Sequence, residues 1–317
     1  MGPMQPGHRM EQELREQPSV LAANADRYLH ELREMVGGTE FEMVLLAARG
    51  SSDNAALYAR YLIEINLRVP VSLAAPSVIT KYGSDMRYPK CLAIGISQSG
   101  EAPDVSEVLG HMRSKGHATL AITNTAGSRL TVESEHSLVL GAGTESSVAA
   151  TKTYTASLLA LYQLVRALGA DMPEVVLPED SFVAECESLA RAASGVLVRS
   201  SVLFALARGY SFCSAHETAL KLMECALLPC KPYSTADFEH GPKALATHGT
   251  AAIVFGEPPA VLAESGCACV QAPTLAPPAS QPVFDAIFGQ WLALHAARAR
   301  GLDPDNPKNL SKVTRTL

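Results

Sequence analysis

The stretch "AIGISQSGEAPDV", residues 93–105, joins a strand pattern, a polar loop and a helix pattern. An apolar run over 91–96 predicts a buried strand, small polar residues follow over 97–100, and an amphipathic segment from Asp104 predicts a helix. Strand, loop and helix in this order form the repeating unit of parallel sheets. The stretch therefore predicts an α/β fold with a loop placed to bind a ligand where the strand ends.

Further short apolar runs extend this pattern along the chain. They are bounded by Gly, Pro, Ser or Asn, and unbroken apolar runs of this length suit strands that are covered on both faces. In the first half they lie at 43–48, 71–75, 119–123 and 137–143, and in the second half at 201–207, 230–235, 250–256 and 267–273. Amphipathic segments between the runs, and a long one over 151–169, predict right-handed βαβ units.

The proline- and acid-rich segment 170–180 predicts a domain boundary. "ARGSS" at 48–52 and "ARGYS" at 207–211 each follow a predicted strand and precede a predicted helix, which favours a duplication. We therefore expect two tandem domains, each a mainly parallel sheet between helical layers in a flavodoxin-like three-layer sandwich. The expected division is a lead-in and helix at 1–39, a first domain at 40–170, a linker helix and second domain at 171–300, and a tail at 301–317.

Composition excludes several classes of protein. The net charge of −6 and the pI of about 5.9 argue against affinity for nucleic acid or anionic membranes. No apolar run is long enough to span a bilayer, and the first residues lack the apolar core of a secretory signal. The seven cysteines are scattered, and only Cys267 and Cys269 form a close pair. We expect reduced thiols, a cytoplasmic protein, no metal and no cofactor.

Three polar loops follow predicted strands, at 49–54, 97–105 and 141–152. The carboxyl ends of parallel strands lie at one edge of a sheet, beside helix N-termini that favour anions. Hydroxyl and amide side chains, with Gly100 for close backbone approach, predict a phosphate site there. The alternative is that each loop is only a capped turn.

Five motifs resemble the sugar isomerase (SIS) domains of the isomerase half of glucosamine-6-phosphate synthase and of related amino-sugar-phosphate deaminases. They are "SQSGEAPDV", "AGTESSVAATK", "ALKLME", "DFEHGPKAL" and "NLSK", within residues 40–317. The resemblance implies that a sugar phosphate binds Ser51, Ser52, Ser97, Gln98, Ser99 and Val148. Ala102 replaces a threonine of the synthases, and the loop around it is closer to the deaminases. Ala150 replaces a serine, so no hydroxyl contact is expected there.

Glu217, Lys221 and Glu224 have the spacing of one helix face. A surface salt bridge is one reading of this spacing, but the apolar neighbours predict a largely buried helix, in which unpaired carboxylates are costly. The resemblance implies that Glu224 is the base that moves a proton between C1 and C2 of the sugar. It gives Glu217 and Lys221 supporting roles.

His240 lies in a turn fixed by Gly241 and Pro242, and Lys312 lies near the end of the chain. As isolated residues they read as a structural histidine and a solvated lysine. The resemblance implies that His240 opens the sugar ring from a neighbouring subunit, hence a homodimer with shared sites. It implies that the tail folds over the site, with Lys312 contacting the sugar carbonyl or forming a Schiff base.

The synthases of this family release ammonia with a cysteine directly after the initiator methionine, where this chain has Gly2. We therefore expect hydrolytic deamination with isomerisation, of the type that converts glucosamine 6-phosphate to fructose 6-phosphate and ammonia. Two alternatives stay open: an aldose–ketose isomerase or fructosamine-phosphate deglycase, and a non-catalytic sugar-phosphate sensor. The joint presence of Glu224, His240 and Lys312 argues against the sensor, which would need no proton-transfer groups.

Overall fold

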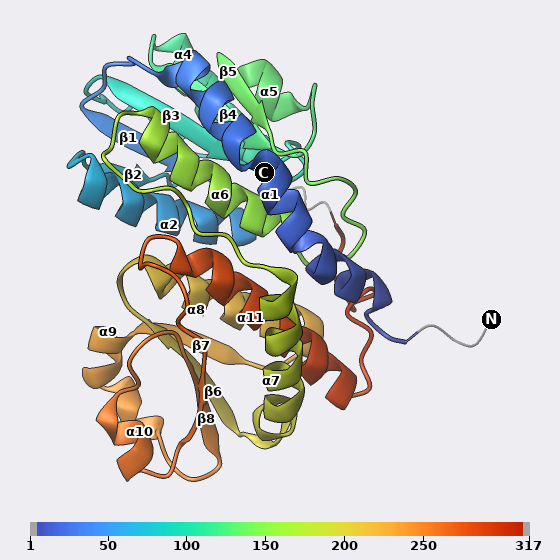
Figure 1. The fold of residues 1–317 in the computed structure, drawn as a ribbon. Helices are drawn as coiled ribbons and strands as arrows, with labels where there is room; N and C mark the ends of the chain where they lie inside the picture. Colours follow the sequence, from blue (N-terminus) through green and yellow to red (C-terminus); the bar gives the residue numbers. More distant parts are fainter. Residues whose placement is uncertain (1–4, 313–317) are drawn as a thin grey trace. The chain divides into compact units, whose positions relative to one another are not determined.

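The computed structural model describes residues 5–312 of the 317-residue chain. It contains two compact units, each built on one parallel sheet (Figure 1). The first unit comprises residues 19–144 and 153–175, and the second comprises 5–18, 145–152 and 176–312. The predicted α/β fold with parallel sheets flanked by helices is confirmed. The predicted boundaries at 39, 170 and 300 stay predictions, and residues 313–317 of the predicted tail lie outside the described residues.

The first sheet has the strand order β2-β1-β3-β4-β5 and is parallel throughout. Its strands are β1 (Met43–Ala47), β2 (Val71–Leu73), β3 (Cys91–Ile96), β4 (Ala118–Thr123) and β5 (His136–Val139). β5 ends earlier than predicted, because Gly141 (φ 64°) and Gly143 (φ 72°) turn the chain away. The strand order reverses between β1 and β3, where ligands bind in open parallel sheets.

The helices around the first sheet are α2 (Ser51–Asn66), α3 (Ser77–Thr80), α4 (Pro103–Ser114), α5 (Arg129–Glu133) and α6 (Lys152–Ala167). Apolar side chains of α4 and Leu130 of α5 pack against β1, β3 and β4 in one buried cluster. Gly95 permits this contact, since a Cβ there would lie 2.9 Å from Leu130 and 3.0 Å from Leu109. Figure 1 shows α2 and α6 on the opposite face of the sheet.

The N-terminal helix α1 (His8–Val36) contributes residues to both units. In the first unit, Arg27 Nη2 donates to the carbonyl oxygens of Val139 at 2.9 Å and Leu140 at 3.0 Å, and the Tyr28 hydroxyl also donates to Leu140. These bonds satisfy carbonyl groups at the end of β5, so this part of α1 fixes where the last strand of the sheet ends.

The second sheet has the order β7-β6-β8-β9 and is also parallel. Its strands are β6 (Val202–Ala207), β7 (Cys230–Ser234), β8 (Thr250–Val254) and β9 (Ala268–Gln271), and all four confirm predicted runs. The helices are α7 (Asp180–Arg199), η1 (Gly209–Ser211), α8 (Phe212–Ala226), α9 (Thr235–Glu239), η2 (Pro242–Leu245), α10 (Ala260–Glu264) and α11 (Gln281–Ala299).

Two layers of helices cover the second sheet. Phe238 of α9 and Leu262 of α10 pack with β6 and β8 in one buried cluster. In the other layer, α11 is buried along nearly its whole length and lies against α7 and α8. Gly289 brings α11 close to α8, because a Cβ there would lie 2.1 Å from Thr218 Oγ1.

All seven cysteines are free thiols, and six of them are buried while Cys269 is exposed. The prediction of mostly buried thiols is therefore confirmed. Among residues 5–312, none of the helices combines the length and apolar character needed to cross a membrane.

Candidate active site

The loops after β1 and β3 lie at the point where the first sheet reverses its strand order. Gly50 (φ 56°) turns the chain after β1, and Ser51 and Ser52 are the first two residues of α2. Both serines are partly exposed. The positive end of the helix dipole lies at this start and favours an anion.

The loop after β3 is held in one shape by its own hydrogen bonds. Ser97 Oγ accepts from Gly100 N and Ser99 Oγ accepts from Glu101 N, both at 3.2 Å. The Gln98 carbonyl accepts from Asn124 N at 3.0 Å. Gly100 (φ 68°) is required, because a Cβ there would lie 2.0 Å from Ser128 Oγ. The structure thus brings the five predicted loop residues, Ser51, Ser52, Ser97, Gln98 and Ser99, to two neighbouring strand ends.

An ion pair joins these two loops. Arg49 Nε donates to Asp104 Oδ2 at 2.6 Å, and the Asp104 side chain is 3% exposed while that of Arg49 is 51% exposed. Asp104 thereby fixes the half-exposed guanidinium of Arg49, which directly precedes Gly50 and the start of α2. Arg49 was not among the predicted site residues, although its position directly before Gly50 in a strand-end loop could have indicated it.

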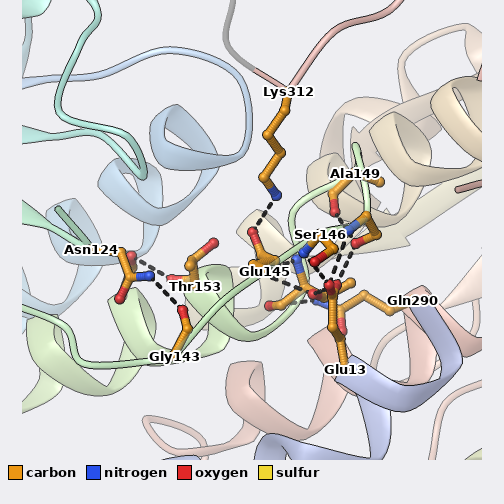
Figure 2. A network of polar contacts seen from close by, with 12 residues as sticks. Glu13, Asn124, Gly143, Glu145, Ser146, Ala149, Thr153, Gln290 and Lys312 are labelled. Atoms are coloured by element: carbon orange, nitrogen blue, oxygen red, sulfur yellow. Dashed lines mark hydrogen bonds and ion pairs between the residues drawn. The ribbon is translucent and has the colours of Figure 1, made fainter. Parts of the chain in front are cut away.

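The third polar loop is divided between the units. Residues up to Thr144 belong to the first unit, where Asn124 Nδ2 donates to the Gly143 carbonyl at 2.9 Å (Figure 2). Residues 145–152, which include the predicted Val148, belong to the second unit. Val148 is partly exposed there.

The three charged residues of α8 form a buried cluster in the second unit. Lys221 Nζ lies 2.5 Å from Glu224 Oε2 and 3.4 Å from Glu217 Oε1. The side chains of Lys221 and Glu217 are 1% and 2% exposed, whereas Glu224 is 25% exposed. Burial alone lowers the pKa of Lys221, but the two carboxylates outweigh it and raise the pKa. The cation therefore stays charged and orients Glu224, the member of the cluster that solvent can reach.

His240 is exposed in the turn after α9. Its backbone N–H donates to the Asp237 carbonyl at 3.0 Å, and Gly241 (φ 145°) and Pro242 form the turn, as predicted. An exposed imidazole on a fixed turn can exchange protons with a bound molecule.

Lys312 lies beside the 145–152 loop. Its Nζ donates to Glu145 Oε2 at 2.6 Å, and Figure 2 shows the side chain pointing at this carboxylate. The Glu145 side chain is fully buried and that of Lys312 is 25% exposed. A buried carboxylate therefore fixes the ammonium group, unlike the reading of Lys312 as an isolated solvated lysine. The predicted contact of Lys312 with the sugar stays a prediction.

No role was predicted for Glu145 or for Glu13, whose carboxylate accepts hydrogen bonds from the same loop. Glu145 carried a signal, since it is a charged residue in a loop that follows a strand. Glu13 carried none, because its partners lie more than a hundred residues further along the chain.

Comparison with known families gives a match to the SIS domain over residues 42–167. Among curated proteins, the chain is 30% identical to a glutamine--fructose-6-phosphate aminotransferase [isomerizing] from Methanothermobacter thermautotrophicus and 31% identical to one from Listeria innocua. Each similarity covers 96% of this chain. The chain spans 57% and 58% of the lengths of these relatives, so it corresponds to a little over half of each.

Among solved structures, a protein from Silicibacter pomeroyi provisionally assigned as a phosphosugar isomerase is 26% identical, with a TM-score of 0.79 over 93% of this chain and 99% of that one. The C-terminal domain of glucosamine-fructose-6-phosphate aminotransferase from Francisella tularensis is 23% identical (TM-score 0.75; 93% and 97% covered). Glucosamine-6-phosphate deaminase from Thermotoga maritima is 22% identical (TM-score 0.73; 94% and 100% covered). The last two likenesses concern the fold alone.

Proposed function

Since the chain contains a SIS domain and is homologous to the isomerase part of glutamine--fructose-6-phosphate aminotransferases, we propose that it is an amino-sugar-phosphate deaminase and isomerase. The proposed reaction converts glucosamine 6-phosphate and water to fructose 6-phosphate and ammonia. It is the reverse of amine transfer onto the ketose and needs no second organic substrate.

One observation carries the proposal: a fully buried lysine holds a partly exposed glutamate at 2.5 Å on α8. A carboxylate that moves a proton between adjacent carbons must be accessible to substrate yet fixed in direction. Glu224 meets both conditions. A protein that only binds sugar phosphates would gain nothing from burying Lys221 and Glu217 beside it.

We assign phosphate binding, ring opening and proton transfer to the residues predicted from the sequence, with Arg49 added. The hydroxyl groups of Ser51, Ser52, Ser97 and Ser99, with the Gln98 amide and the Arg49 guanidinium, bind the phosphate. His240 moves the proton that opens the ring. Glu224 takes the proton from C2 and returns it to C1, which leaves an imine at C2 that water hydrolyses to the ketone and ammonia. Lys312 donates a hydrogen bond to the C1 oxygen, and Val148 contacts the sugar.

The direct test is incubation with glucosamine 6-phosphate, with ammonia and fructose 6-phosphate measured together. We expect equal amounts of both products.

Glu224→Gln keeps the shape of the side chain but cannot accept a proton from carbon, so the rate should fall about 10²–10⁴-fold. In D₂O the variant should introduce no deuterium at C1. Glu264→Gln, an exposed glutamate of α10, is the matched control and should behave like the unmodified protein. Loss of activity in both variants, or in neither, would reject the assignment of Glu224.

A second function is favoured by the 26% identity with the Silicibacter protein, which extends over 99% of that chain. In this alternative the chain interconverts aldose and ketose phosphates with the same base and releases no amine. Formation of glucose 6-phosphate from fructose 6-phosphate, with no ammonia from any amino-sugar phosphate, would favour it. A fructosamine-phosphate deglycase would instead release the amine partner of a fructosamine phosphate.

Three further proposals accompany the function. The four strands of the second sheet repeat the order of the first four strands of the first sheet, which supports a second SIS domain and a duplicated chain. The exposure of His240 suits a homodimer in which this residue serves the neighbouring site, and mixtures of Glu224→Gln and His240→Ala subunits should then recover activity. The free thiols suit the cytoplasm.

A further inference from the structure

Glu13 places a carboxylate inside the second unit, on the first turns of α1. The residue is 4% exposed, and a carboxylate buried to this extent must be hydrogen-bonded to be tolerated. It accepts from the backbone N–H groups of Ser146 and Ser147, the latter at 3.0 Å. It also accepts from the hydroxyl groups of Ser147 and Thr151, the latter at 2.7 Å. Figure 2 shows these contacts converging on one side chain.

All four donors belong to the loop 145–152, which carries Glu145. The Thr151 N–H donates to Glu145 Oε1 at 2.9 Å, and the Thr151 hydroxyl lies 3.0 Å from the same oxygen. That hydroxyl is also the one that reaches Glu13, so it can donate to either carboxylate. The other oxygen of Glu145 accepts from Lys312 Nζ at 2.6 Å. Chain segments that are far apart in the sequence are therefore linked through one loop.

The same part of α1 is fixed to the segment that leads to Lys312. Asp305 accepts from the N–H groups of Arg9 at 2.8 Å and Met10 at 3.0 Å, and Asp303 accepts from Gly7 N at 2.8 Å. These acceptors satisfy the unpaired donors at the start of α1. The N-terminal helix thus holds both partners, the loop with Glu145 and the segment with Lys312.

We propose that Glu13 is a positioning residue, which sets the shape of loop 145–152 so that Glu145 fixes the Lys312 ammonium group. The catalytic consequence rests on the proposed function, since it assumes that Lys312 contacts the sugar. The positioning itself does not depend on any reaction. Glu13 is one helical turn from Glu16, whose carboxylate lies 2.5 Å from Lys152 Nζ at the end of the loop, so α1 holds the loop at two points.

Two substitutions of Glu13 separate the need for its hydrogen bonds from the need for its charge. In Glu13→Gln, the amide oxygen can still accept from Ser146 and Ser147, and its NH₂ group can donate to the two hydroxyls. Thr151 can then donate to Glu145. In Glu13→Ala, two backbone N–H groups lose their acceptor inside the protein, which loosens the loop. We therefore expect the glutamine variant to keep the function that the alanine variant loses.

The test is the reactivity of Lys312 toward an amine-acylating reagent at low conversion, measured by mass spectrometry relative to the exposed Lys308. Glu13→Ala should raise the Lys312-to-Lys308 ratio about fivefold, as expected for one net hydrogen bond lost. Glu13→Gln should leave the ratio unchanged. Glu11→Ala is the matched control, because Glu11 lies on the same helix and pairs with Arg298 at 2.6 Å. Glu145→Gln sets the upper limit, since it removes the partner of Lys312 directly.

An unchanged ratio in Glu13→Ala would overturn the proposal. If this variant does not fold, Ser147→Ala combined with Thr151→Val removes both hydroxyl donors at almost constant volume. The ratio should then rise in this variant, and an unchanged ratio would overturn the proposal equally.

Kinetics separate the two proposals. If the protein is active, Glu13→Ala should lower kcat and leave KM nearly unchanged, and Glu13→Gln should restore kcat. If no amino-sugar phosphate reacts but the labelling ratio rises, the proposed function fails and the positioning role stands. If the protein is active and the ratio does not change, the positioning role fails alone.

Discussion

The starts of helices α2 and α8 occupy equivalent places in the two units, because each follows the strand at which its sheet reverses order. A glycine with positive φ precedes each start, Gly50 (56°) before α2 and Gly209 (64°) before α8. At α2 the first residues, Ser51 and Ser52, are partly exposed. The start of α8 lies near Asp285 of α11, a carboxylate that is 2% exposed. One helix start is accessible to an external anion, and the other has an acid from its own chain nearby.

Under the proposed function, the two helix starts serve different tasks. In the first unit the loops carry hydroxyl and amide groups that cost little to leave in water, which suits a site that fills and empties. In the second unit α8 carries charged groups that are costly to bury unless they pair, which suits proton transfer in a fixed direction.

Lys221→Met should have the largest effect on stability. It leaves the Glu217 carboxylate, which is 2% exposed, without its cation, and breaking a buried pair typically costs about 3–5 kcal/mol. Arg49→Met removes the cation that pairs with Asp104 in the first unit. It should lower the free energy of unfolding clearly less, because Arg49 is 51% exposed and water can replace it. Urea denaturation of both variants measures the difference. Equal losses would remove the contrast between the units.

The second prediction concerns pH. Burial raises the pKa of Asp285 to about 6, and hydrogen bonding from Gln281, Ser211 and Ser214 offsets this only in part. The folded protein therefore binds a proton more tightly than the unfolded chain, so the contribution of Asp285 to stability falls as pH rises from about 4 to about 6 and stays low above that. A shift of this size corresponds to about 3 kcal/mol.

Asp285→Asn should remove this dependence. As pH rises from 4 to 6, the unmodified protein should lose stability relative to the variant. Denaturation at each pH measures the two free energies of unfolding. Asp303→Asn should instead show its change below about pH 4, and in the opposite direction. Burial alone raises the pKa of Asp303, but hydrogen bonds from Asn306 and from backbone N–H groups outweigh it and lower the pKa. If the difference in free energy of unfolding for Asp285→Asn did not change with pH, ionising Asp285 would cost no more in the folded protein than in the unfolded chain.

The smallest effect is expected at the first helix start. Ser97→Ala with Ser99→Ala removes two hydroxyl donors, each worth about 0.5–1.5 kcal/mol, so KM for a sugar phosphate should rise while kcat changes little. Ser211→Ala is the matched control before α8, where the side chain makes no capping hydrogen bond to the helix, and it should leave KM unchanged. An equal rise in KM for both would place phosphate binding in both units.

Much of the fold could be predicted because it depends on local patterns. Each predicted apolar run became a strand, and the spacing of Glu217, Lys221 and Glu224 placed them on one helix face. The length of β5 was wrong because two glycines and Asn124 bend the chain after Val139, and no alternation of apolar residues reports such a turn. The short helices α3, α5, α9 and α10 were not predicted, since they are too short to show a period.

The candidate site was predictable in part for the same reason. The loop residues follow from their place after strands, and Glu224 was singled out by the family resemblance. Arg49 and Glu145 were overlooked although each stands in a strand-end loop. Glu13 could not have been found. Its partners in loop 145–152 are 133 or more residues away, and an acid in a polar helix reads as solvated.

Local sequence patterns are enough to predict the strands, the long helices and the polar loops, and with them the edge of the first sheet where polar side chains gather. These features arise from periods of two and 3.6 residues and from turn residues, which act over a few neighbours. Which charges are buried, and which groups they contact, depends on the tertiary structure. Glu145 and Lys312, 167 residues apart, and Asp285 beside α8 depend on how helices pack, and that packing arises from contacts that no local pattern encodes.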